Sequence, residues 1–331
     1  MVGYLVRRLA ACVIVLAVVC VFTFMIFFWF SPDPAAQICG KTCTPDRIAQ
    51  IRANLGLDQP FLEQLRVFVS GLFAGRDWGT GADAMHCAAP CLGYSFQTNE
   101  SVTDLLIDRL PVSVTLATGA AVLWLLVGVL GGLVSAVRRD SLWDKGVLAF
   151  GLVGISLPIY FLALVLQYLL VVKLGWLPFP RAVPFTEDPV LWFESYLMPW
   201  VVLAIVYAAM YSRIVRSQVI DTLEQGFVRT ARAKGLQRHL VLRRHALRPS
   251  LTPVVTLFGM DFAALLGGAL ITETVFGLDG VGKLASDSMA TNDQPVIMGV
   301  TLLAALLVVV ANLVVDISYR FLDPRVRRGT P

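Results

Sequence analysis

Long apolar runs separated by shorter polar segments form the main pattern along this chain. Six runs are long enough to be membrane spans: Leu9–Phe30, Val112–Val137, Val147–Val172, Tyr196–Val215, Pro253–Phe276 and Val296–Tyr319. About 20 helical residues cross a hydrocarbon core of roughly 30 Å. None of the runs alternates as a barrel strand does, and backbone polar groups in lipid must be bonded within their own segment. The pattern therefore predicts an all-α membrane protein with six transmembrane helices.

Composition strengthens this prediction. Of 331 residues, 57% are hydrophobic and 15% are charged, and the mean hydropathy is +0.72. In a soluble domain about a quarter of the residues carry charge. Because Arg7 and Arg8 precede the first run, a cleaved signal peptide is an alternative there. The run is too long for a signal core and no small-x-small cleavage site follows it, so we expect a retained helix.

The basic residues are distributed unevenly between the two sides of the predicted membrane. With both termini placed inside, 18 of the 27 Lys and Arg residues are cytoplasmic, and 16 of the 23 Asp and Glu residues lie outside. Lys and Arg in short loops resist translocation. We therefore expect a multi-pass protein of the plasma (inner) membrane with cytoplasmic N- and C-termini. The net charge of +4 averages a basic inner face with an acidic outer one and does not indicate nucleic-acid binding.

The spans divide the chain into four parts. We expect a first transmembrane helix, a small extracytoplasmic domain between helices 1 and 2, a core of helices 2 to 6 with a large cytoplasmic loop, and a cytoplasmic tail. Their ranges are 1–30, 31–111, 112–320 with the loop at 216–249, and 321–331. Helical spacing and terminal signals predict two helices within the extracytoplasmic domain, at Pro45–Leu55 and Gln59–Phe73.

Four cysteines lie in that domain, as Cys39-x3-Cys43 and Cys87-x3-Cys91. An extracytoplasmic compartment is oxidising, so disulfides are the favoured interpretation, with three pairings open and free thiols as an alternative. Zinc is disfavoured because the spacing is not C-x2-C and His86 is the only histidine outside. We expect no metal site.

The cytoplasmic loop contains a distinctive predicted helix, Asp221–Lys234. Acids in its first turn and cations in its last would complement the helix dipole, and Gly235 stands where a left-handed C-cap is expected. Its small apolar patch and the cations around it are Phe227, Val228, Ala231, Arg229, Arg232 and Lys234. A second basic helix is predicted at Gln237–Leu247. An ordinary loop whose charges only enforce topology remains the simpler alternative.

The sequence of Phe227–Leu236, Phe-Val-Arg-Thr-Ala-Arg-Ala-Lys-Gly-Leu, followed by the segment 242–248, resembles the coupling-loop signature of binding-protein-dependent ABC importer permeases. Arg229 and Thr230 replace the generic Glu and first Ala, as is usual in the peptide and nickel branch, whereas Ala231 and Gly235 match. Segments that resemble the B-type permease of this branch occur along nearly the whole chain, at 4–9, 31–34, 55–60, 268–282 and 322–325. The cysteine-bearing insert does not match the common family pattern.

This resemblance implies a type I ABC importer permease fold and a transport role. The chain would pair with a second homologous permease, two cytoplasmic ATP-binding subunits or domains, and an extracytoplasmic substrate-binding protein. ATP and Mg would be bound by the ATPase partners, with no cofactor in this chain. The ATPase-coupling positions would be Phe227, Val228, Arg229, Thr230, Ala231, Lys234 and Gly235. The implied substrates are di- or oligopeptides, with nickel or another small solute as an alternative.

A function of another class, an ATP-independent channel or secondary carrier, gives no reason for the helix at 221–236. Asp261 is the one acid deep in an apolar run. An intramembrane charge faces either a cavity or a partner. Asp261 is therefore either a pathway residue that meets a peptide's ammonium group, or a hydrogen-bond acceptor for a neighbouring helix or subunit.

Two further patterns do not support chemistry in this chain. Gly277–Lys283 mimics a phosphate-binding P-loop, but Leu284 replaces the required Ser or Thr and no strand precedes the segment. The chain's three histidines, His86, His239 and His245, are too scattered for a catalytic set. We expect no enzyme activity and no catalytic residues.

Overall fold

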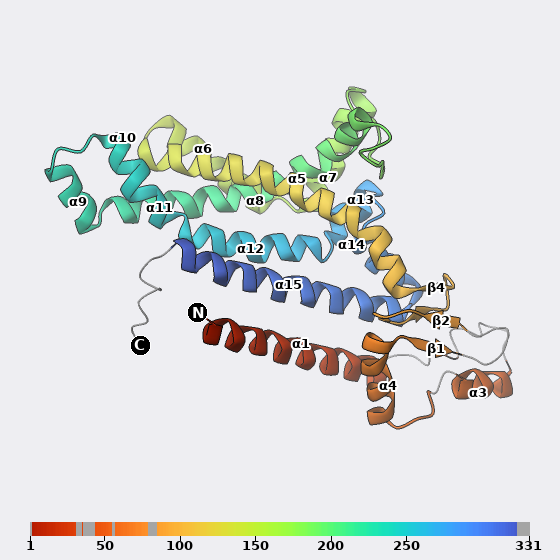
Figure 1. Cartoon of the computed structure of the whole chain (residues 1–331). Coiled ribbons are helices and arrows are strands. Elements are labelled where there is room, and N and C mark those ends of the chain that lie inside the picture. Colours follow the sequence, from red (N-terminus) through yellow and green to blue (C-terminus); the bar gives the residue numbers. More distant parts are fainter. Residues whose placement is uncertain (1, 31–34, 36–43, 55–56, 79–84, 323–331) are drawn as a thin grey trace.

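The computed structural model describes residues 2–30, 35, 44–54, 57–78 and 85–322. Five helices lie side by side and form the main bundle of the molecule (Figure 1). They are α1 (Val2–Phe30), α5 (Val102–Val137), α8 (Pro189–Leu223), α12 (Thr252–Leu266) and α15 (Gln294–Leu322). When α11 (Leu247–Ser250) is counted together with α12, 5 helices among the described residues are long and apolar enough to cross a membrane. The number rises to 6 if one bent pair of helices is counted as a single span.

That bent pair replaces the straight third span predicted at Val147–Val172. Helix α6 (Leu142–Ser156) and helix α7 (Ile159–Gln167), which continues as η2 (Tyr168–Lys173), meet at an angle of 100°. Pro158 causes the break, because proline has no N–H and restricts the residue before it. Leu157 accordingly has extended backbone angles, φ −85 and ψ 126. The prediction of one continuous helix here was wrong.

The fifth predicted span is also interrupted. Helix α12 ends at Leu266, and the short α13 (Leu270–Phe276) starts after the Gly267–Gly268 pair. Gly268 has φ +118, and a Cβ there would lie 2.6 Å from the backbone of Gly282. Only glycine combines this backbone conformation with so close an approach. The continuous helix predicted over Pro253–Phe276 is therefore corrected to two helices.

The core is built on the pair α5 and α8. Trp124 of α5 and Tyr211 of α8 are fully buried, with ring centroids 6.1 Å apart. Gly128 and Gly132 let the two helices approach, since a Cβ at either position would lie within 2.8 Å of atoms of α8. Helix α12 packs against α5 and α8 and, more extensively, against α15.

Helix α5 begins earlier than the predicted second span. Its N-cap is Ser101, whose hydroxyl accepts a hydrogen bond from the Asp104 amide at 3.1 Å. Pro111, the residue before the predicted run Val112–Val137, lies inside the helix. The first turns of α5 pack against α14 (Val281–Thr291) and α15 in a small separate core.

The segment between α1 and α5 combines helices with very short strands. Helices α3 (Pro45–Asn54) and α4 (Phe61–Ala74) match the two predicted there. The strands were not predicted: β1 (Arg76–Trp78) pairs antiparallel with β2 (Met85–Cys87), and β3 (Tyr94–Ser95) with β4 (Glu100–Ser101). Phe24 of α1 packs on Phe61 and Phe68 of α4, with centroids 5.7 and 5.5 Å apart.

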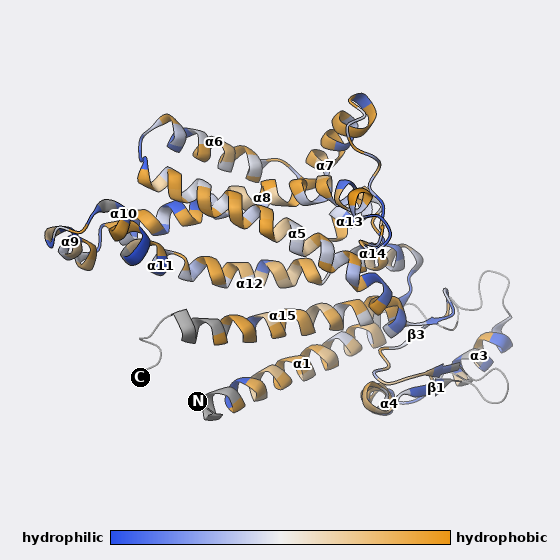
Figure 2. Ribbon diagram, turned by 45° about the horizontal axis from the view of Figure 1, so that its top comes forward, coloured by the Kyte–Doolittle hydropathy of each residue, from blue (hydrophilic) through white to orange (hydrophobic). Residues whose placement is uncertain are grey.

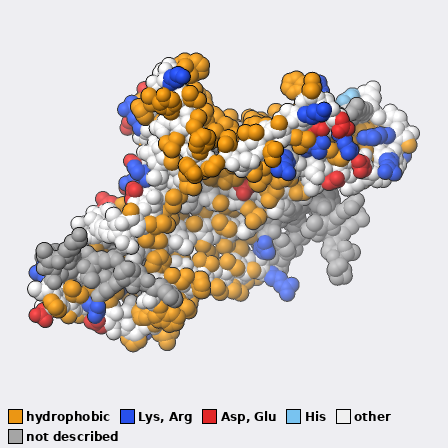
Figure 3. Space-filling model, turned by 180° about the vertical axis from the view of Figure 1, so that it is seen from behind, with side chains coloured by type: hydrophobic (Ala, Val, Ile, Leu, Met, Phe, Trp, Pro, Cys, Tyr) orange, Lys and Arg blue, Asp and Glu red, His pale blue; other side chains and the backbone are white. Residues whose placement is uncertain are grey.

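The polar elements gather at the two ends of the bundle (Figure 2). One end carries the start of α1, the end of α15 and the helices α9 (Gly226–Ala233) and α10 (Arg238–Leu240), with η3 (Val241–Ala246). The strands and α14 lie at the other. Hydrophobic side chains cover the middle of the face shown in Figure 3, and most charged side chains there lie toward the ends. This distribution suits a hydrocarbon layer around the middle of the bundle.

Candidate functional site

The predicted coupling segment contains two helices where we expected one. Helix α8 runs on to Leu223, and α9 starts at Gly226 after a break at Glu224–Gln225. Asp221 therefore belongs to the end of α8, and α9 has no acid in its first turn. The predicted pattern of acids first and cations last in one helix, Asp221–Lys234, was wrong, although Arg232 does lie in the last turn of α9.

The predicted stop at Gly235 is confirmed. Gly235 has φ +80, and its N–H donates to the Arg232 carbonyl at 2.9 Å. The N–H of Leu236 donates to the Ala231 carbonyl at 3.4 Å. These two bonds make a Schellman motif, which satisfies the last carbonyls of the helix and turns the chain back toward α10.

The apolar patch of α9 is divided between two faces. Val228 and Ala231 are buried in a small cluster with Val241 and Leu223, so they attach α9 to its own loop. Phe227 is 42% exposed, and Leu236 and Leu240 are exposed to a similar extent, at 40% and 42%. We expected one small apolar patch of Phe227, Val228 and Ala231. The structure leaves Phe227 exposed and places the other two inside.

The polar side chains of α9 are exposed. Arg229, Arg232 and Lys234 all face solvent. Thr230 is exposed too, and its hydroxyl donates to the Gly226 carbonyl at 3.0 Å. The outward face of α9 thus combines one large aromatic side chain with several cations.

The loop is tied back to α8 by a buried hydroxyl. Ser250 of α11 donates to the Ala246 carbonyl at 2.7 Å and lies 3.1 Å from the Gln218 carbonyl and 3.0 Å from the Thr222 hydroxyl. Gln218 and Thr222 belong to the last turns of α8. Helices α8 and α11, which precede and follow α9 in the sequence, are therefore joined directly to each other.

Asp261 lies in the middle of α12 and is partly exposed. The Tyr211 hydroxyl of α8 donates to its Oδ2 at 2.7 Å. Aromatic rings lie close by: Trp124 stacks on Tyr207 at 4.7 Å, and Phe258 is 6.0 Å from Trp124. The structure thus shows a hydrogen bond to a neighbouring helix, one of the two roles expected for Asp261, in a residue that is partly exposed.

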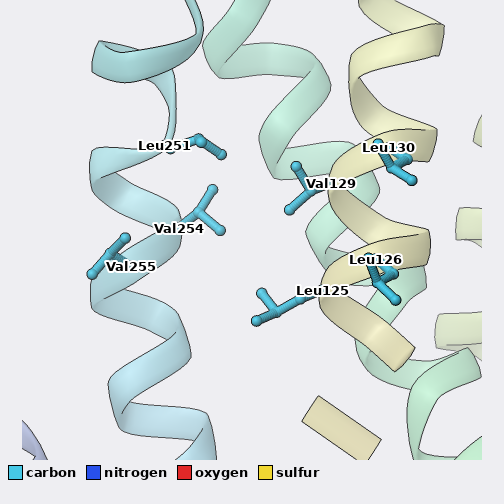
Figure 4. Close-up of a pocket in the computed structure, with 7 residues that line it drawn as sticks. All are labelled: Leu125, Leu126, Val129, Leu130, Leu251, Val254 and Val255. Atoms are coloured by element: carbon cyan, nitrogen blue, oxygen red, sulfur yellow. The ribbon is translucent and has the colours of Figure 1, made fainter. Parts of the chain in front are cut away.

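A hollow between α5 and α12 lies within the apolar middle of the bundle. It measures about 300 Å³, and across it Leu125 and Val129 of α5 point toward Leu251 and Val254 on the α12 side (Figure 4). The lining residues are Leu125, Leu126, Val129, Leu130, Leu251, Val254 and Val255. All are aliphatic, so the hollow offers no side-chain hydrogen bond to a polar solute.

The P-loop-like segment is occupied by a side chain of the protein itself. Glu273 is fully buried, and its Oε2 accepts the Lys283 N–H at 3.0 Å. Its Oε1 accepts the Ser113 hydroxyl at 2.8 Å and the Ala269 N–H at 3.3 Å. Because the amide of Lys283 is directed at Glu273, this turn is a structural joint between α5, α13 and α14.

At the end of the bundle opposite α9, Cys87 and Cys91 form a disulfide. Both sulfurs are consumed in the bond, so this pair has no thiolate for zinc. Cys39 and Cys43 lie outside the described residues. Within the residues that the structure describes, no group of three or more His, Cys, Asp or Glu could hold a metal ion.

Sequence reasoning missed two polar joints built on buried acids, Glu273 with Ser113 and Asp144 with Arg216. Their members are 160 and 72 residues apart in sequence. The available signal was an acid at the edge of an apolar stretch, since a buried acid requires partners. The identity of those partners depends on which helices pack together, which hydropathy does not reveal.

Comparison with known proteins identifies the family. The model of the binding-protein-dependent transport system inner membrane component matches residues 128–328, and that of the N-terminal part of such a membrane component matches residues 1–117. The chain belongs to this family. It is therefore a multi-pass permease of the inner membrane, from a family of transport proteins that work with a binding protein.

Relatives of known description align along the whole permease. A Brucella abortus protein provisionally described as a peptide transport system permease is 36% identical over 327 residues, 99% of each chain. The di/tripeptide transport system permease protein of Pseudomonas aeruginosa is 33% identical over 348 residues, again 99% of each. The glutathione transport system permease protein of Escherichia coli is 32% identical over 327 residues and 99% of each.

A solved structure supports the fold. An inward-facing form of the MetNI methionine ABC transporter superimposes with a TM-score of 0.53, covering 66% of the permease and 96% of that chain. Sequence identity is 17%, so this match concerns the fold alone. It confirms the predicted type I ABC importer permease fold.

Proposed function

We propose that this permease and a second, homologous one form the translocation pathway of an ABC importer for di- or oligopeptides. Two ATP-binding subunits on the cytoplasmic side bind ATP and Mg, and an extracytoplasmic binding protein delivers the peptide. The N- and C-termini are cytoplasmic, since the basic residues concentrate at the end of the bundle that carries α9. The relatives named for di/tripeptide and glutathione transport, which align over 99% of their length, support the substrate class.

Helix α9 carries the coupling proposal. Its buried side is fixed to the loop by Val228 and Ala231, and its end is fixed by Gly235. Its outer side presents Phe227 among exposed cations. A helix that is fixed on one side and exposes an aromatic side chain on the other is suited to bind a partner, because the aromatic side chain can fill a pocket there. We assign contact with the ATPase to Phe227, Arg229, Thr230 and Lys234, and a supporting role to Val228, Ala231 and Gly235.

Asp261 is proposed as a residue of the pathway. Its hydrogen bond from Tyr211 fixes one carboxylate oxygen, and the residue is partly exposed, as a group that meets a passing ammonium must be. In a nonpolar layer such a charge is costly unless it faces a cavity or a partner. The hollow of Figure 4 is lined only by aliphatic side chains, so it offers no charged group that could meet the ammonium in place of Asp261.

Uptake by the reconstituted complex tests the proposed function. Proteoliposomes that contain the permease with its second permease, ATPases and binding protein are expected to accumulate a radiolabelled dipeptide only with hydrolysable ATP. An excess of unlabelled tripeptide should compete, and nickel should not. Equal uptake without ATP would indicate a channel or secondary carrier, and ATP-driven uptake of nickel but not of peptide would indicate the other substrate class. Either result contradicts the proposal.

A further inference from the structure

An ion pair between the buried Asp144 and the part-buried Arg216 joins three helices near the end of the bundle that carries α9. Asp144, in the first turn of α6, is 2% exposed. Arg216 of α8 donates to both of its oxygens, from Nε to Oδ1 at 2.7 Å and from Nη2 to Oδ2 at 2.9 Å. The Ser135 hydroxyl of α5 also donates to Oδ1, and the Asp140 amide donates to Oδ2 at 2.9 Å. Both oxygens therefore accept two hydrogen bonds each.

The geometry of this pair is unusually restrictive. A guanidinium fork that meets a carboxylate at two points fixes both the distance and the relative orientation of the two groups. Because Ser135 and Asp140 occupy the remaining lone pairs, the carboxylate cannot rotate without losing bonds. The first turn of α6 is thus held at one position along α8.

Further along, α6 is held against α8 by close backbone packing. A Cβ at Gly154 would lie 2.7 Å from Cβ of Ala209, and a Cβ at Gly151 would lie 3.2 Å from the stem of Arg213. These contacts bring α6 close to α8, but apolar contacts are non-directional and fix no single position along the helix axis. The ion pair supplies the fixed point along the helix axis.

The position of Arg216 connects this fixed point with α9. Arg216 lies seven residues before Leu223, where α8 ends, and Leu223 packs against the buried face of α9. Helix α6 spans about 22 Å and leads to the 100° bend at Pro158. A continuous chain of contacts therefore runs from α9 through α8 and the ion pair to α6 and the bend.

Stability alone is a weak reason for such a pair. Replacing both members of a buried ion pair with apolar side chains of similar size is often neutral or stabilising, whereas removing one member leaves a costly unpaired charge. An alternative reason is that the pair makes α6 and α8 move together.

We propose that Asp144 and Arg216 are positioning residues that lock α6 to α8, so that a displacement of α9 is transmitted to the α6–α7 bend. The inference rests on the proposed coupling role of α9. Motion of α9 moves the end of α8, the ion pair carries α6 with it without slippage, and the bend at Pro158 changes position at the far end of α6. Without the pair, α8 can move while α6 lags behind.

The test compares Asp144→Leu/Arg216→Met with wild type in the reconstituted complex. This double variant removes both charges together and is expected to assemble normally. Asp144→Leu alone leaves Arg216 without its partner and is expected to lower the amount of assembled complex. ATP hydrolysis without substrate should stay near wild type in the double variant. Peptide uptake per ATP hydrolysed should fall about tenfold, within the range of roughly 5- to 150-fold typical of coupling between sites.

Arg213→Met is the matched control. Arg213 lies on the same face of α8 near Arg216, its side chain is exposed, and methionine keeps the apolar stem that packs on Gly151. This variant should keep the wild-type uptake per ATP. An unchanged ratio in the double variant beside an active wild type would overturn the lock and leave the proposed function standing. Absence of ATP-driven uptake in the wild-type complex would instead contradict the proposed function, and the lock with it.

Discussion

Replacing Gly119 with leucine is expected to prevent α5 and α8 from packing together, so that little folded permease accumulates. A Cβ at Gly119 would lie 2.1 Å from the ring of Trp200. That ring has no room to withdraw, because its Nε1 donates to the Thr115 carbonyl at 3.1 Å and Trp192 packs on it at 5.3 Å. Overpacking costs typically 1–3 kcal/mol and occasionally more. We expect a cost of about 3 kcal/mol or more here, because the clash is with a fixed ring.

The measurement is the yield of monodisperse permease extracted from membranes, by size-exclusion chromatography. Gly146→Ala is the matched control, because a Cβ at this position of α6 meets nothing within 4 Å. Alanine in an exposed helix is favoured over glycine by about 0.5–1 kcal/mol. A normal yield for Gly119→Leu would show that the close contact of α5 with Trp200 is not part of the folded protein.

Replacing Glu273 with alanine is expected to cause the second large loss of stability. The change leaves three donors without their acceptor: the Ser113 hydroxyl and the amides of Ala269 and Lys283. Each buried donor left unsatisfied costs about 1–3 kcal/mol. We expect a total of at least about 3 kcal/mol and a fall of more than about 5 °C in the melting temperature of the detergent-solubilised permease.

Asp279→Asn is the control for Glu273. It removes a carboxylate six residues away that is exposed and accepts Lys283 Nζ at 2.7 Å, with Arg109 at 3.2 Å. The hydrogen bond from Lys283 is the main reason that the pKa of Asp279 lies below its usual range. Its stabilising effect is thus fully present at neutral pH and is lost as the pH falls from about 4 through the lowered pKa. Exposed pairs contribute at most about 1 kcal/mol, so at neutral pH this variant should melt close to wild type. Similar melting of the two variants would contradict the buried role of Glu273.

The sequence predicted the membrane class, the helical fold and the position of the spans because these depend on local composition. It did not predict the breaks in the third and fifth spans. Hydropathy passes smoothly over Pro158 and Gly268, although both residues carry a local signal. Pro199 lies within α8 without ending it, so that signal alone does not decide where a helix breaks.

The candidate site was predictable only in part. The stop at Gly235 follows from a local rule of helix ends and was confirmed. The start of α9 was misplaced because an acid such as Asp221 is favoured in the first turn of a helix. In the structure α8 continues to Leu223, and Thr222 near its end bonds to Ser250. The burial of Val228 depends on Val241, which reaches it only after the chain has turned. Contacts between residues that meet only after the chain has turned cannot be predicted from local sequence; they can be identified only once the fold is known.

The most direct test of the central claim, that α9 couples this permease to ATP hydrolysis, is Phe227→Asp in the reconstituted importer. Phe227 is 42% exposed, so the variant should fold and insert normally. Leu142→Asp is the matched control, an apolar-to-acid change at an 85% exposed position at the same end of the bundle. We expect Phe227→Asp to lower peptide uptake and substrate-stimulated ATP hydrolysis about tenfold or more, and Leu142→Asp to leave both near wild type. Full uptake and full stimulation by the Phe227→Asp complex would contradict the account.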